Sequence, residues 1–255
     1  MTKIIAVTLR KGGSGKTTTA VNLATALHLK GKKTLLVDLD PQANATISVG
    51  IDSMALPRHI NTLFTDINTK TSEAIVTTSF GLPLLPSHPD LADTEAGMRA
   101  TQIGLLTGLL EPVKQDYDYI VIDTPPAESY LTVNAMAVAD EIIIPLQAHY
   151  LAMRGLQDII DETEQVKKGL NPTLKVAGIL PTMVHNRTNV AKTVIEAVTE
   201  SYKGLLYPLQ VEFSIKHAEA TLAGLPIVIY DPTHQGSIVY MKLADIVMKG
   251  GKNGK

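Results

Sequence analysis

The sequence predicts an α/β protein, a mostly parallel sheet covered by helices on both faces. Short apolar, β-favouring runs alternate along the whole chain with segments of helical periodicity. Several of these runs are apolar throughout, which is typical of strands buried on both faces. A glycine-rich turn at residues 11–18 joins the first run to the first helical segment. In such folds ligands bind at the carboxyl ends of the strands, where this turn lies.

The predicted elements follow one another in the order that such a sheet requires. The expected strands are residues 4–9, 33–38 (introduced by Gly31), 82–86 (a weaker run), 119–123 (ended by Pro125 and Pro126), 141–146, 175–180 and 204–207. The expected helices are residues 17–29, 93–114, 131–139, 153–168, 189–201 and 237–248. No repeat or low-complexity linker divides the chain, so we expect a single domain over residues 1–249 and a flexible tail over residues 250–255.

Composition excludes several classes of function. The 255 residues include no cysteine, which excludes disulfides, a thiolate-held iron–sulfur cluster and a thiol nucleophile. The longest apolar runs fall short of the ~20 residues that a membrane span needs, and the N-terminus enters a strand directly. We therefore expect a cytoplasmic protein without membrane attachment.

The charge distribution permits a nucleic-acid partner but does not require one. The formal net charge is −2, yet residues 165–217 hold seven Lys and Arg against three Asp and Glu. A surplus of this size is often a solvated face, and it also suits DNA phosphates. The absence of Trp and the presence of only three Phe disfavour single-strand recognition by base stacking.

The turn at residues 11–18 has the context of a phosphate-binding loop: strand, glycine-rich turn, helix N-terminus. Its expected nucleotide-binding residues are Lys11, Gly12, Gly13, Ser14, Gly15, Lys16, Thr17 and Thr18. The glycines let backbone N–H groups cradle phosphate oxygens, and the following helix adds partial positive charge. Lys16 would reach the terminal phosphates, and Thr17 would ligate Mg²⁺. The general pattern has a glycine where this chain has Arg10, with Lys11 beside it.

Three acidic residues follow predicted strands. Asp38 and Asp40 flank Leu39, and Asp123 ends the run 119–123. Each carboxylate by itself could cap a helix or belong to a turn. Beside a phosphate loop they suit Mg²⁺ coordination through water and orientation of an attacking water, the requirements of in-line phosphoryl transfer.

These residues resemble the ParA/MinD family of deviant Walker A ATPases, in particular its short, Soj-like ParA type. The resemblance begins at residues 11–18, continues through residues 37–46 and 119–126, and extends to residues 178–183, 186–189 and 225–231. It implies that Lys11 reaches across a nucleotide-sandwich dimer to the partner's phosphates. It also implies that Lys11, Lys16 and Asp40 are catalytic, Asp40 by orienting water, and that Asp38 and Asp123 are the magnesium-side acids, acting through water.

The resemblance further implies that basic residues on the dimer's face bind DNA when ATP is present. Arg187 and Lys216 fall on such positions, although the segment before Lys216 is less basic than in the family. Both residues could instead be paired locally or solvated. Pro181, Thr182 and Met183 lie at a strand end and could line the adenine pocket, the alternative being plain apolar packing.

The expected function is that of an ATPase that binds MgATP, dimerises and binds nonspecific, nucleoid DNA. A ParB-like or other adaptor protein would stimulate hydrolysis, and the cargo would be plasmid or chromosome DNA. One alternative is the same chemistry positioning a protein organelle such as a carboxysome, or a receptor cluster. The other is an ATP-dependent interaction switch that does not bind DNA.

Overall fold

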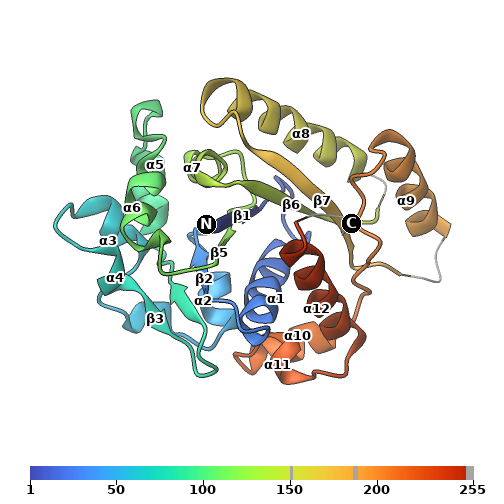
Figure 1. Cartoon of the computed structure of the whole chain (residues 1–255), viewed down its shortest axis with the longest axis horizontal. Helices are drawn as coiled ribbons and strands as arrows, with labels where there is room; N and C mark the ends of the chain where they lie inside the picture. The colour runs from blue at the N-terminus through green and yellow to red at the C-terminus, as the bar shows by residue number, and fades with distance from the viewer. Residues whose placement is uncertain (150–151, 186–188, 251–255) are drawn as a thin grey trace.

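The computed structural model describes residues 1–149, 152–185 and 189–250, which form one seven-stranded sheet between two helical layers (Figure 1). The strand order is β3-β4-β2-β5-β1-β6-β7, and every neighbouring pair is parallel except β3 with β4. The strands are β1 (Lys3–Val7), β2 (Thr34–Asp38), β3 (Val76–Thr77), β4 (Pro83–Leu85), β5 (Tyr119–Asp123), β6 (Glu141–Gln147) and β7 (Lys175–Thr182). The predicted α/β class is confirmed.

Alternation along each strand divides the apolar side chains between two cores. In β1, Ile4 and Ala6 join one buried cluster, whereas Ile5 and Val7 join the other. All four are fully buried, as expected when helices cover both faces of a parallel sheet.

The helices form one layer on each face. On the first face lie α3 (Ile60–Thr65), α4 (Thr71–Ala74), α5 (Leu91–Gly97), α6 (Leu105–Lys114), α7 (Tyr130–Val138), α8 (Ala152–Gly169) and α9 (Asn189–Ser201). On the second lie α1 (Lys16–Leu29), α2 (Asn44–Ser48), α10 (Lys216–Leu222), α11 (Ile227–Tyr230) and α12 (Gln235–Met248). Helices α1 and α12 run side by side across the sheet (Figure 1). Two 3-10 turns, η1 (Ser53–Ala55) and η2 (Ala100–Gln102), complete the elements.

The prediction of one continuous helix over residues 93–114 is wrong. The segment forms α5, η2 and α6, because Met98 leaves α5 in extended backbone (φ −62°, ψ 150°) and Gly104 adopts φ +100°. The amide oxygen of Asn134 accepts hydrogen bonds from the N–H groups of Gly104 (2.9 Å) and Leu106 (3.3 Å), which caps the start of α6.

Residues 204–207 do not form the expected strand. Leu206 pairs with Ile179 of β7 only as an isolated bridge, through Ile179 N–H to Leu205 O (2.7 Å) and Tyr207 N–H to Ile179 O (2.9 Å). The next rung of a parallel ladder requires an N–H from Pro181, which proline lacks. The ladder therefore stops after one bridge.

The elements that the sequence reading missed are short. They are α2, η1, α3, α4, β3, α10 and α11, each of two to seven residues. Such lengths are too small for apolar periodicity to show. Within the residues that the structure describes, no helix is long and apolar enough to cross a membrane.

Candidate functional site

The phosphate loop connects the carboxyl end of β1 to the N-terminus of α1. Gly13 and Gly15 adopt φ +67° and +84°, in the left-handed region that glycine enters without strain, and Gly15 caps α1. The Ser14 hydroxyl donates to the carbonyl of Lys11 (3.1 Å). From β7, the Thr182 hydroxyl donates to the carbonyl of Ser14 (2.7 Å). These bonds hold the loop as a turn around the helix N-terminus.

Lys16, the first residue of α1, is buried within this turn. Its side chain is only 6% exposed, and its ammonium donates to the carbonyl of Lys11 (3.0 Å). Burial lowers the pKa of Lys16, while the charges of Asp123 and Asp40 oppose that shift. A cation is therefore held inside the loop, between its backbone and two carboxylates.

Asp38 is a fully buried carboxylate at the end of β2, and short hydrogen bonds fix its position. One oxygen accepts from the backbone N–H (2.8 Å) and the hydroxyl (2.7 Å) of Thr46, and the other accepts from the N–H of Asp40 (3.1 Å). Burial raises the pKa of Asp38 to about 6, against these hydrogen bonds. Asp40 itself accepts from the N–H of Gln42 (2.9 Å).

Asp123 stands opposite Asp38 in the register of β5 and β2, and its surroundings are different. It is fully buried, and neither carboxylate oxygen has a hydrogen-bond partner among the described residues. Burial and then the charge of Asp38 raise its pKa well above the usual range. The nearby Thr17 hydroxyl and the Lys16 ammonium favour the charged form, but neither completes a hydrogen bond of good geometry.

This donor set fits a hard divalent cation. A buried carboxylate with two unpartnered oxygens lies near the Thr17 hydroxyl and close to Asp38, and oxygen donors of this kind suit Mg²⁺. The chemistry of these carboxylate and hydroxyl oxygens is the basis on which the site fits Mg²⁺. Thr17 and Asp123 would hold the ion, and Asp38 would hold its water ligands.

Two adjoining cavities open beside the loop. The first, about 320 Å³ and called the phosphate cavity below, is lined by the loop, Asp40, Asn44, Ser48 and Pro126. The second, about 280 Å³, extends from Gly15 and Thr18 toward α10 and α12. The cavities share Gly15, Thr18, Met183 and Thr221 along their common boundary. Together they provide a polar compartment at the loop and a more apolar one next to it, within the size range of ligand sites.

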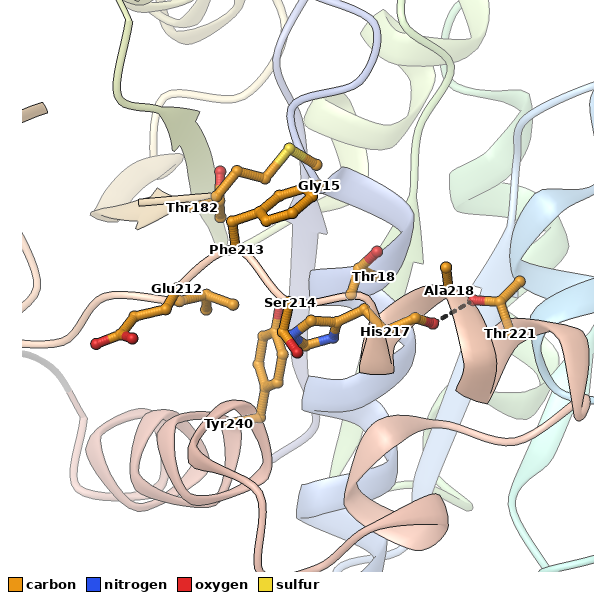
Figure 2. A pocket seen from close by; sticks show the side chains of 12 residues that line it. Gly15, Thr18, Thr182, Glu212, Phe213, Ser214, His217, Ala218, Thr221 and Tyr240 are labelled. Carbon is orange, nitrogen blue, oxygen red and sulfur yellow. Dashed lines mark hydrogen bonds between the residues drawn. The ribbon is translucent and has the colours of Figure 1, made fainter. Parts of the chain in front are cut away.

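Figure 2 shows the second cavity, with Thr182 and Phe213 on one side and His217 and Tyr240 on the other. Of the predicted adenine-pocket residues, Thr182 and Met183 line this cavity and Pro181 does not. The structure adds a wall that the sequence reading missed, comprising Val211, Glu212, Phe213, Ser214, His217, Ala218, Thr221 and Tyr240. This wall comes from a short irregular segment and from α10 and α12, which carry no motif.

Comparisons with known proteins identify the family. A family model described as an AAA domain matches residues 2–176. The sporulation initiation inhibitor protein Soj of Bacillus subtilis (strain 168) is 39% identical over 253 residues, covering 98% of this chain and 100% of that protein. The chromosome-partitioning ATPase Soj of Thermus thermophilus is 37% identical over 245 residues, covering 96% and 94%. The chain belongs to the ParA/MinD family of ATPases.

A solved structure agrees with this assignment. The cobyrinic acid a,c-diamide synthase of Mycobacterium smegmatis, with bound ATP analog and magnesium, superposes with a TM-score of 0.84 at 33% identity, covering 100% of this chain and 98% of that chain. The two Soj relatives confirm the Soj-like resemblance that the motifs indicate.

In this ParA/MinD-family chain, Lys11 and Lys16 point to different surroundings. Lys16 lines the phosphate cavity, whereas the ammonium of Lys11 lies 3.4 Å from the side-chain oxygen of Gln147, at the end of β6. Lys11 is absent from the residues that line either cavity. The sequence predicted Lys11, but nothing in it pointed to Gln147.

The two predicted DNA-binding residues differ in what the structure shows of them. Arg187 lies outside the described residues. Lys216 begins α10, and its ammonium pairs with Glu219 (2.7 Å) and lies 5.9 Å from the centre of the Tyr230 ring. Hydrogen bonding to Glu219 raises the pKa of Lys216. The ammonium is therefore charged, exposed and locally paired.

Proposed function

We propose that this chain is a Soj-like ATPase that binds MgATP, dimerises around it, and binds nonspecific DNA as the dimer. The observation that carries the proposal is the meeting of Lys16, Asp40 and Asp123 at one phosphate loop, with no hydrogen-bond partner for the Asp123 carboxylate among the described residues. The bound nucleotide and magnesium of the related Mycobacterium smegmatis structure support the choice of ligand.

In the proposed reaction, these residues divide the work of hydrolysis. The loop N–H groups and Lys16 bind and neutralise the phosphate oxygens. Bound Mg²⁺ neutralises charge on the transferring phosphoryl group. Asp40 is 6% exposed and lines the phosphate cavity, where its carboxylate can orient the attacking water. The hydrogen bonds from Thr46 favour the charged form of Asp38 and fix its carboxylate.

The position of Lys11 supports the proposed dimerisation. The Lys11 ammonium lies against Gln147, outside the phosphate cavity of its own chain. Of the two lysines, only Lys16 lines that cavity in a single copy. A second copy facing the site can supply the missing cation, and positioned cations of this kind raise phosphoryl-transfer rates strongly. Completion of the site only in the dimer couples assembly to ATP.

The DNA-binding step uses Lys216, Arg187 and the basic surplus of residues 165–217. Lysine and arginine contacts to phosphates read no sequence, so the binding should be nonspecific and sensitive to salt. An adaptor protein, ParB-like or otherwise, would stimulate hydrolysis and release the dimer, so that DNA cargo is positioned over the nucleoid within the cytoplasm.

Binding to random-sequence duplex DNA tests the proposal. Fluorescence anisotropy with MgATP, MgADP and no nucleotide, each across a salt series, should show binding with MgATP alone. The logarithm of affinity should fall linearly with the logarithm of salt concentration. Equal binding in all three states, or none in any, would refute the DNA-binding part.

An ATP-dependent interaction switch is the second candidate, and the pairing of Lys216 with Glu219 favours it. A cation occupied by a neighbouring carboxylate is a weaker DNA contact than a free one. Under this alternative, MgATP produces dimers in light scattering while duplex DNA stays unbound at low salt.

A further inference from the structure

Arg10 occupies the position where the general phosphate-loop pattern has glycine, and its side chain lines neither of the two cavities. Its side chain is 29% exposed and makes two ion pairs. Its Nε lies 3.0 Å from Oε2 of Glu162, and one terminal nitrogen lies 3.0 Å from Oε2 of Glu128. A guanidinium can contact two carboxylates at once because its donors form a rigid, planar fork.

The two carboxylates have different surroundings. The Glu162 side chain, on α8, is 5% exposed, and burial raises its pKa while Arg10 opposes the shift. The Glu128 side chain is 71% exposed. A buried ion pair holds a fixed geometry, whereas an exposed one forms and breaks readily. Glu162 therefore anchors Arg10, and Glu128 is the exchangeable partner.

Glu128 belongs to the loop of residues 124–129, which begins directly after Asp123 and ends at Ser129, the N-cap of α7. The same loop borders the phosphate cavity, which Pro126 lines. A side chain placed on Gly12 would come within 3.9 Å of Pro126. The loop thus lies against the phosphate loop at Pro126 and is held by Arg10 two residues later.

We propose that Arg10 is a positioning residue for hydrolysis. Anchored on α8 by Glu162, it holds residues 124–129 through Glu128, and so fixes Pro126 against the phosphate loop. The proposal rests on the ATPase activity proposed above. Arg10 touches neither cavity, so its effect falls on turnover rather than on nucleotide affinity. In GTPases, contacts to the terminal phosphate and its Mg²⁺ order the switch loops, and here Arg10 supplies a fixed point for residues 124–129.

The test compares single-turnover hydrolysis of MgATP, with protein in excess over nucleotide and well above Kd, with nucleotide affinity from calorimetry. The variants are Glu128→Gln, Arg10→Gln, Arg10→Lys and the double Arg10→Gln/Glu128→Gln. Arg58→Gln is the matched control, because it removes an arginine from the exposed pair with Glu73 (3.3 Å), which lies outside both cavities.

Loss of positioning should lower the turnover rate about fivefold in Glu128→Gln and about tenfold or more in Arg10→Gln, with Kd for ATP within about twofold of wild type. The double variant should be no slower than Arg10→Gln, since both changes break one link. Arg10→Lys should recover only part of the rate, because an ammonium lacks the fork. Arg58→Gln should match wild type.

Three results would overturn the proposal: wild-type turnover in Glu128→Gln, multiplicative losses in the double variant, or an affinity loss that accounts for the loss of rate. Glu128→Gln and Arg10→Lys keep the test decisive even if Arg10→Gln unfolds. A wild-type protein without turnover would refute the proposed ATPase function and the role of Arg10 together. Turnover in wild type with an unaffected Glu128→Gln would refute only the role of Arg10.

Discussion

Replacing Asp123 by Asn should stabilise the nucleotide-free protein and weaken its response to MgATP. The carboxylate of Asp123 is fully buried, and neither oxygen has a hydrogen-bond partner within the described ranges. A buried unsatisfied polar group costs about 1–3 kcal/mol, more when it is charged. The amide of Asn removes the charge but leaves polar atoms unpartnered, so we expect a gain of about 1 kcal/mol.

Thermal unfolding measures this gain directly. For a chain of this size, about 1 kcal/mol corresponds to roughly 2–4 °C in Tm. The Tm of nucleotide-free Asp123→Asn should therefore rise by that amount. Asp116→Asn is the matched control, because Asp116 is exposed and precedes the opposite end of β5, so its Tm should not change.

The ligand response should change in the opposite direction. Nucleotide at about 100 times Kd stabilises a folded protein by about 2.7 kcal/mol. Wild type and Asp116→Asn should show the full Tm increase with MgATP, whereas Asp123→Asn should show less than half of it, because a magnesium-side oxygen is lost. A lower Tm without nucleotide, together with an unchanged MgATP response, would refute the assignment of Asp123.

Four further predictions concern other residues. Lys16→Ala should weaken ATP binding about 100-fold or more, because its buried ammonium is the proposed side-chain donor to the phosphates; wild-type affinity in calorimetry would contradict this. Asp40→Ala should bind ATP and dimerise in light scattering yet hydrolyse poorly, and normal phosphate release would place the water-orienting role elsewhere. Lys11→Ala should keep monomeric nucleotide affinity and lose turnover; an active variant would exclude a role in trans. His217→Leu should remove an acid-sensitive loss of stability. Burial lowers the pKa of His217 to about 4. As pH falls from about 6.5 to about 4, the unfolded chain takes up a proton that the folded chain excludes. This difference lowers the free energy of unfolding by at most about 3 kcal/mol. Urea unfolding at pH 7 and pH 4.5 should show a smaller pH dependence in His217→Leu, and an equal dependence would contradict it.

The sequence could predict the part of the site in which the phosphate-loop motif and the acidic residues lie at the carboxyl ends of strands. Residues 119–123 form β5 with the predicted bounds, and the acid at its end faces Asp38 across the register. The parallel arrangement of β5, β2 and β1 then brings Asp123, Asp38 and the phosphate loop to one edge of the sheet. Apolar runs and topology were sufficient for this, because the carboxyl ends of parallel strands meet at the same edge.

The rest depends on contacts between residues far apart in the chain. Phe213 and His217 reach the second cavity through an irregular segment and a seven-residue helix, so no periodicity marks them. The partner of Lys11, Gln147, lies 136 positions away, and Arg10 meets Glu162 across 152. Which side chain lacks a partner, as Asp123 does among the described residues, follows only from packing in three dimensions.

The ion pair of Lys216 with Glu219 does not by itself decide between DNA binding and an interaction switch. Their side chains are 43% and 38% exposed, and an exposed pair three residues apart on a helix adds little stability. A polyanion with a condensed counterion layer can therefore compete with Glu219 for the ammonium. What decides is how many cations face the same side of the proposed dimer, since each phosphate neutralised adds to the salt slope. Glu219→Gln separates the two functions: it should strengthen DNA binding of an ATP-bound dimer that already binds, and it should leave a pure interaction switch unable to bind DNA.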